Sequence, residues 1–127
     1  MAQNTNEYGK IVSVAEAANL FGQFVTSYQL LTIDLLDYCQ NAGRVIMFAE
    51  ENNELYIAGT GRTTLSTNTQ PPSPDLIFHV FSVTKVNELI TLGNEQFTIV
   101  EIRTDVVDLK NGEYVLEYGW PCPPYCS

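Results

Sequence analysis

Residues 43–59 read GRVIMFAEENNELYIAG, and this stretch decides how the rest of the chain can fold. Two apolar runs, Val45–Ala49 and Leu55–Ala58, flank a polar break that contains Asn52 and Asn53. Asparagine tolerates the left-handed backbone of a tight turn, so the stretch predicts a β-hairpin. Both strands are apolar on both faces and must therefore be covered on both. We expect the hairpin in the middle of a sheet, or between a sheet and a second layer.

The residues before this hairpin predict two helices. Ser13 and Glu16 have the spacing of a capping box, and apolar residues then recur every three or four positions from Val14 to Leu31. This helix is expected to pack on the protein's own sheet, with pairing to a second copy as the alternative. A shorter helix is expected from about Ile33 to Asn41, and Gly43 ends it.

The residues after the hairpin predict a long loop and further strands. Residues 59–75 are rich in glycine, threonine, serine and proline and show no periodicity. They predict a polar loop that is either mobile or used for binding. Strands are expected at residues 76–84, 96–103 and 114–118. Residues 86–92 fit a strand or a helical turn equally well.

This order of elements predicts an α+β fold, in which two N-terminal helices pack on one face of a largely antiparallel sheet of five or six strands. The length of 127 residues indicates one domain. We place this domain at residues 11–118, between a loose N-terminus of residues 1–10 and a tail of residues 119–127. The sequence shows no internal repeat.

The charge of the chain excludes several partners. Fifteen acidic residues against six basic ones give a net charge of -9, which repels nucleic acid phosphates and anionic membranes. The N-terminus has no secretory signal pattern, and no apolar run approaches the roughly 18 residues of a membrane span. We expect a soluble, cytoplasmic protein that binds neither nucleic acid nor membrane. Acidic pairs such as Glu50 and Glu51 are expected on solvated faces.

The cysteines leave three possibilities open. Cys122 and Cys126 lie close enough in sequence to form a disulfide that closes a small loop. With Cys39 and His79 they would make a zinc site of three cysteines and one histidine, although a second close pair of ligands is missing. Free thiols or bridges to another molecule are the third possibility. The surrounding prolines and aromatic residues also fit a docking peptide.

Catalytic chemistry has no positive evidence in the sequence. His79 is the only histidine, and its apolar strand favours a structural role over that of a general base. No serine or cysteine lies in a nucleophile motif, and the carboxylates match no metal or glycosidase pattern. Glycine-rich residues 59–62 lack the spacing and the lysine of a phosphate loop. We therefore expect no cofactor and lean against an enzyme.

Three segments carry a resemblance to known sequences. Residues 41–43 (NAG), the hairpin at residues 44–59 and the closing residues 121–126 (PCPPYC) together resemble a group of small bacterial proteins of unknown function, of the kind found in Bacteroidota. The resemblance covers about half of the chain. It implies a bacterial protein without a cofactor and transfers no functional residue.

Two classes of function remain after these exclusions. The first is a non-catalytic acidic interaction or assembly protein, which self-associates or binds another protein through the aromatic residues Phe21, Phe24, Tyr28, Trp120 and Tyr125. A narrower form is an acidic inhibitor, similar to an immunity protein, that blocks a basic nuclease. The alternative is a small-molecule-binding or enzymatic domain with an aromatic pocket between helices and sheet, lined by Phe21, Phe24, Tyr28 and His79.

Overall fold

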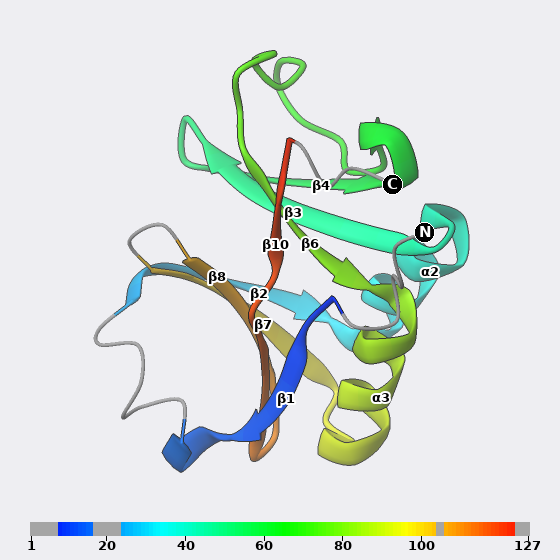
Figure 1. Ribbon diagram of the computed structural model, residues 1–127, viewed down its shortest axis with the longest axis vertical. Helices are drawn as coiled ribbons and strands as arrows, with labels where there is room; N and C mark the ends of the chain where they lie inside the picture. The colour runs from blue at the N-terminus through cyan, green and yellow to red at the C-terminus, as the bar shows by residue number, and fades with distance from the viewer. Residues whose placement is uncertain (1–7, 17–23, 104–105, 124–127) are drawn as a thin grey trace, which may run out of the picture.

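The computed structural model describes residues 8–16, 24–103 and 106–123, and in this part of the chain ten strands form two antiparallel sheets (Figure 1). The first sheet has the order β1-β9-β8-β7-β2 and the second the order β10-β6-β3-β4-β5. The strands of the first sheet are β1 (Lys10–Ser13), β2 (Phe24–Leu31), β7 (Phe97–Arg103), β8 (Val106–Asn111) and β9 (Tyr114–Glu117). Those of the second are β3 (Val45–Glu51), β4 (Glu54–Gly59), β5 (Thr63–Thr64), β6 (Phe78–Ser82) and β10 (Trp120–Cys122).

The predicted arrangement of helices on a single sheet is wrong. The described residues contain both helix and strand, but most of their regular structure is strand, and the strands lie in two sheets. A helix begins at Val14, where the Glu16 N–H donates to Ser13 Oγ at 3.2 Å as a capping box predicts. From Phe24 to Leu31, however, the expected helix is strand β2. Aromatic and β-branched residues favour extended backbone there, and pairing with β7 outweighs the helical spacing.

The hairpin and the second helix are confirmed. Helix α2 (Thr32–Ala42) leads through Gly43 into β3, and β3 turns back into β4 at Asn52 and Asn53, whose φ angles are 54° and 62°. Strand β3 is the central strand of the second sheet, between β6 and β4. The ambiguous segment at residues 86–92 is helical and belongs to α3 (Val83–Gly93).

The fold contains an internal repeat that the sequence did not reveal. The unit β2-α2-β3-β4-β5 is followed by the unit β6-α3-β7-β8-β9. Helices α2 and α3 have 11 residues each, β3 and β7 have 7, and β4 and β8 have 6. Helix α3 begins at residue 83 where α2 begins at 32, and β7 begins at 97 where β3 begins at 45. The helices and the hairpin strands of the two units thus begin 51 or 52 residues apart.

The two units exchange their first strands. Strand β2 of the first unit pairs with β7 of the second, and β6 of the second unit pairs with β3 of the first. Each helix therefore carries the chain from one sheet to the other. Figure 1 shows α2 and α3 together at one end of the two sheets. Neither unit can complete its own sheet without the other.

A main core lies between the two sheets and the helices. Its fully buried members include Leu35 of α2, Phe48 of β3, Leu89 of α3 and Leu109 of β8. Side chains alternate between the two faces of β3 and of β7. The positions that point into this core are equivalent in the two strands. The helices thereby cover one end of the space between the sheets, and the hairpin ends lie at the other.

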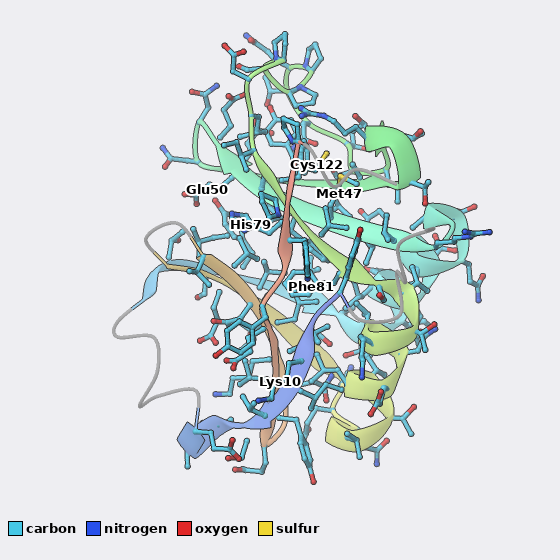
Figure 2. All side chains as sticks on the ribbon, in the orientation of Figure 1. Lys10, Met47, Glu50, His79, Phe81 and Cys122 are labelled. Carbon is cyan, nitrogen blue, oxygen red and sulfur yellow. The ribbon has the colours of Figure 1, made fainter. Side chains whose placement is uncertain are left out.

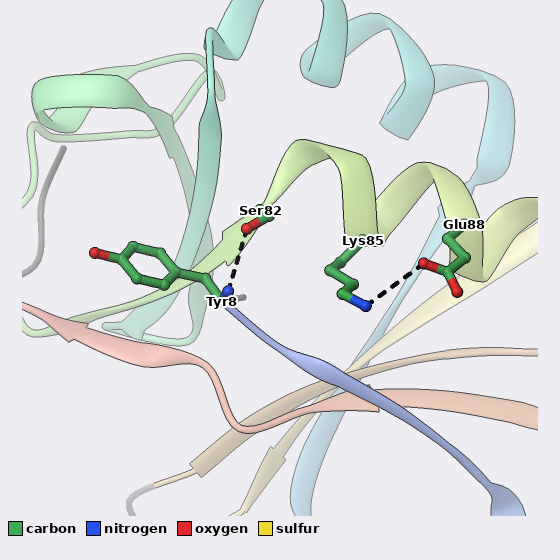
Figure 3. A network of polar contacts seen from close by, with 4 residues as sticks. All are labelled: Tyr8, Ser82, Lys85 and Glu88. Atoms are coloured by element: carbon green, nitrogen blue, oxygen red, sulfur yellow. Dashed lines mark hydrogen bonds and ion pairs between the residues drawn. The ribbon is translucent and has the colours of Figure 1, made fainter. Parts of the chain in front are cut away.

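A second core covers the outer face of the second sheet. Tyr8 is 1% exposed there and stacks on Trp120, with ring centroids 5.3 Å apart. The Tyr8 N–H donates to Ser82 Oγ at 3.2 Å (Figure 3). Tyr8 falls in the predicted loose N-terminus, and Trp120 in the predicted tail, so segments expected outside the domain contribute to its core. The Lys85–Glu88 ion pair in the same view is exposed and adds little stability.

The predicted polar loop is fixed to the β3–β4 hairpin. After the 3₁₀ turn η2 (Thr60–Arg62) and β5, the Thr69 N–H donates to a carboxylate oxygen of Glu54 at 3.1 Å. The Tyr56 hydroxyl donates to the Gln70 carbonyl at 2.9 Å. The loop therefore covers part of the second core and carries its own set of hydrogen bonds.

A buried amide joins the end of α3 to the end of β8. Asn111 is fully buried, and its Nδ2 donates to Thr98 Oγ1 at 2.8 Å, while its Oδ1 accepts from the Glu95 N–H at 3.0 Å. A Cβ on Gly93 would lie 2.1 Å from that Oδ1. In the first unit, a Cβ on Gly59 would lie 2.7 Å from Ala42. Both units thus bring the helix end against the second hairpin strand.

We predict that Asn111→Ala lowers the free energy of unfolding by about 2–3 kcal/mol, because it leaves the buried partners of the amide without a hydrogen bond. Urea unfolding at neutral pH measures this change. Asn87→Ala on the exposed side of α3 is the matched control and should stay within about 0.5 kcal/mol of the wild type. A loss for Asn111→Ala no larger than that of the control would contradict the role of this network.

Candidate functional site

A small cavity of about 140 Å³ lies between the two sheets at the end away from the helices. The first sheet contributes the apolar side chains of Ile102, Val106 and Val107, and the second contributes the polar side chains of Glu50 and His79. These residues lie next to the turns of the β3–β4 and β7–β8 hairpins and at the start of β6. The cavity is therefore formed by both units of the repeat.

Strand register places Glu50 and His79 on the same face. Phe48 lies opposite His79 in the β3–β6 ladder and points into the main core. Glu50 follows Phe48 by two residues, so its side chain leaves β3 on the same inner face. Figure 2 shows Glu50 and His79 near one another at the hairpin end of the second sheet. Both side chains are partly exposed, which leaves the cavity open to solvent.

Tyr28 links the first sheet to this site. Its hydroxyl donates to Glu50 Oε2, so strand β2 reaches across the gap between the sheets. Burial is the main cause that raises the pKa of Tyr28 above its ordinary value, and the hydrogen bond and negative charge of Glu50 raise it further. The neutral phenol is thus the form that suits this position. The contact joins the two sheets at the end away from the helices.

The structure brings only some of the predicted site residues together. Tyr28 contacts Glu50, and Glu50 and His79 line the same cavity. This cavity lies between the two sheets, whereas we expected an aromatic pocket between helices and sheet. Trp120 lies in β10 opposite Val80, next to His79, but it packs on Tyr8 in the second core, on the other face of the sheet. Phe24 begins β2, and Phe21, Tyr125 and Cys126 lie outside the described residues.

Glu50 is the site residue that the sequence prediction missed. We expected Glu50 and Glu51 on a solvated face, but Glu50 is only partly exposed and faces the first sheet. A signal for this was present in the sequence. Ile46 and Phe48 define the inner face of β3, and strict alternation puts the next inward position at residue 50.

The structure does not assemble the three-cysteine, one-histidine set. Cys39 of α2 lies in the main core, where burial raises the pKa of its thiol to about 12. Cys122 of β10 lies in the core on the opposite face of the second sheet and is disulfide-bonded. Within the described residues, no group of three histidine, cysteine or acidic side chains is placed to hold a metal ion. The pairing of Cys122 with Cys126 stays a prediction because Cys126 is outside those residues.

A second candidate is the free edge of the first sheet. Strand β2 has eight residues and stands at the end of the strand order, and among the described residues only β7 pairs with it. The Thr32 N–H donates to the Gln96 carbonyl at 2.8 Å, and this fixes which residues of β2 bond to β7. By alternation, the N–H and C=O groups of Ser27, Gln29 and Leu31 point away from β7, toward the open edge.

From Thr26 to Leu31, beyond the shift in register between Phe24 and Thr26, the described part of this edge carries no charge or proline of the kind that usually prevents edge-to-edge pairing. Natural edge strands are commonly short, charged or interrupted by proline. The other sheet edges follow this rule, since β1, β5 and β10 have four, two and three residues. By contrast, the sequence from residue 17 to residue 33 contains neither a charged residue nor a proline. Next to the edge lie three exposed apolar side chains: Leu31, Ile33 and Phe97, which are 39%, 72% and 42% exposed.

No protein-family model, curated protein or solved structure matches this chain. The resemblance to small bacterial proteins therefore stays a prediction, as do the expected cytoplasmic location and the expected partners. In the described part of the chain, no helix combines the length and the apolar character needed to cross a membrane. The cavity and the β2 edge are the two features of the described residues that bear on function.

We predict that Tyr28→Phe lowers the free energy of unfolding by about 1–2 kcal/mol at pH 7, because Glu50 loses its hydroxyl donor. The raised pKa also predicts a pH effect. Above about pH 10 the unfolded phenol ionises while the folded one stays neutral, so wild-type stability falls as pH rises, and the variant falls less steeply.

Denaturant unfolding between pH 7 and pH 11 measures both effects. Tyr38→Phe is the matched control, because Tyr38 is also partly buried and its hydroxyl has no hydrogen bond with the described residues. Equal stability of Tyr28→Phe and wild type at pH 7, with parallel curves up to pH 11, would rule out the link between the sheets.

Proposed function

We propose that this protein is a non-catalytic assembly protein, in which β2 of one copy pairs antiparallel with β2 of a second copy. The observation that carries the proposal is the long, uncharged edge of the first sheet at β2, with which no described strand other than β7 pairs. Antiparallel pairing of identical strands about a two-fold axis is self-complementary and closes as a dimer. It would join the two five-stranded sheets into one continuous sheet.

The internal repeat supports this choice of surface. Strand β6 is the counterpart of β2 in the second unit, and its edge is occupied by β10, with Trp120 opposite Val80 and Pro121 opposite His79. Within the described residues, the equivalent edge of β2 has no such strand. A second copy would supply to β2 the pairing that β10 supplies to β6.

Charge favours the same surface. Two chains that each carry a net charge of -9 repel one another, and this repulsion extends over a Debye length of about 8 Å at physiological salt. Contact at the edge of β2 places no acidic side chain of that strand against the other copy, because residues 24–31 carry no charge. Ile33, Leu31 and Phe97 would become buried, and each large side chain fully removed from water contributes about 1.5–3 kcal/mol.

Salt dependence separates this proposal from the acidic-inhibitor alternative. An uncharged strand edge gains from added salt, because salt screens the repulsion between the two copies. An acidic surface that blocks a basic nuclease loses affinity steeply under the same change. The direction of the salt effect therefore distinguishes the two functions.

The test is Gln29→Pro, because Gln29 directs its N–H to the open edge and proline removes this donor without breaking a β2–β7 hydrogen bond. We predict that wild type is dimeric by native mass and light scattering, and that Gln29→Pro is monomeric with an unchanged fold by circular dichroism. Gln29→Thr, which retains the N–H and favours strands, should remain dimeric. A dimeric Gln29→Pro variant, or a monomeric wild type at high concentration and high salt, would contradict the proposal.

A further inference from the structure

We infer that the cavity between the hairpin ends binds a small monocyclic amine in its protonated form, with its ammonium group on Glu50 and its ring against the first sheet. This site is independent of the β2 edge, since the lining side chains come from β3, β6, β7, β8 and the residue before β6. The inference rests on the size of the cavity, on the unequal chemistry of its two walls and on the surroundings of Glu50.

The size of the cavity limits the ligand to about one ring. The cavity holds about 140 Å³, and an apolar cavity of about 150 Å³ in another protein accommodates benzene. A nucleotide or a peptide could place only one small group inside it. A ring that carries one short polar substituent fits the space.

The two walls of the cavity differ in chemistry. The wall from the first sheet is made only of the branched aliphatic side chains of Ile102, Val106 and Val107, whereas on the other side Ala49 and Ile77 lie beside the polar groups. The polar groups, Glu50 and His79, both belong to the second sheet. A ligand that matches both walls is apolar at one end and polar at the other.

The repeat accounts for this difference between the walls. Glu50 is the sixth residue of β3, and Ile102 is the sixth residue of β7, so the two occupy equivalent positions in the two units. One unit thus supplies a carboxylate where the other supplies an aliphatic side chain. The backbone geometry that the two units share does not require an acid at residue 50, because β7 has an isoleucine at the equivalent position, residue 102.

The surroundings of Glu50 favour a cation. The contact made by its carboxylate is with the neutral hydroxyl of Tyr28, which donates to Oε2. Among the side chains that the structure describes, no lysine or arginine forms an ion pair with Glu50. A partly buried carboxylate beside aliphatic groups is stabilised by a positive hydrogen-bond donor. The net charge of -9 also raises the local concentration of cations.

The experiment compares benzylamine with benzyl alcohol, which has nearly the same shape and no charge at pH 7. Methyl signals of Val106 and Val107 in ¹³C-¹H NMR spectra report binding to the cavity of the full-length protein. We expect benzylamine to bind at least about tenfold more tightly than benzyl alcohol, as a charge-assisted hydrogen bond predicts. Glu50→Gln should remove this preference and leave the affinity for benzyl alcohol within about twofold.

Two further variants complete the test. Glu113→Gln removes one negative charge at an exposed position and should bind both compounds as wild type does, which separates contact with Glu50 from the overall charge. Val106→Phe fills the cavity and should abolish the binding of both compounds. Equal affinities of wild type for the two compounds, unchanged amine binding in Glu50→Gln, or no saturable shift in the millimolar range would each overturn the inference.

Discussion

The exchange of β2 and β6 between the two units is the constraint on which the rest of this structure depends. Each unit leaves its first strand in the sheet of the other, so the pairs β2–β7 and β3–β6 join residues far apart in the chain. Both sheets and the core between them must therefore form together. Helices α2 and α3 carry the chain from one sheet to the other, and they have the same length. The two connections between the sheets are therefore equivalent. Strand pairs between residues this far apart slow folding, because the entropy of closing the loop is lost before the contacts form.

The same exchange sets the place of both candidate sites. Because both crossings are at the helical end, the two hairpins meet at the other end and leave a cavity between unlike walls. Because β2 enters the first sheet from the first unit, it takes the outermost position, where the described residues leave its second edge bare. Strand β2 serves both sites: its inner face carries Tyr28 to Glu50, and its edge presents the N–H groups of Ser27 and Gln29.

Local features of the sequence predicted the parts of the fold that depend on local interactions. The hairpin at residues 43–59 was correct because its turn residues and its two-sided apolar strands act within a few residues of each other. Helix α2 was correct for the same reason. The helix predicted over Phe24, Tyr28 and Leu31 was wrong, because the spacing of these residues fits a helix while their residue types fit a strand. Pairing with β7, about seventy residues later in the chain, decides between the two. Propensity alone could not reveal that partner.

The repeat and the cavity were hidden for a related reason. Equivalent positions such as Phe48 and Val100, or Ile57 and Leu109, share their burial in the core but not their side chains, so no repeated motif exists to be found. Glu50 could have been placed by the alternation of β3. The cavity itself could not, because its other wall belongs to a hairpin fifty residues away whose position follows from the strand exchange.

Hydrogen exchange of individual backbone amides in β2, measured at low and at high protein concentration, tests the central claim most directly. If a second copy pairs with the open edge, the amides of Ser27, Gln29 and Leu31 become protected as concentration rises. The amides of Thr26, Tyr28 and Leu30, which bond to β7, stay protected throughout. Fast exchange of the first three amides at every concentration would contradict assembly through β2.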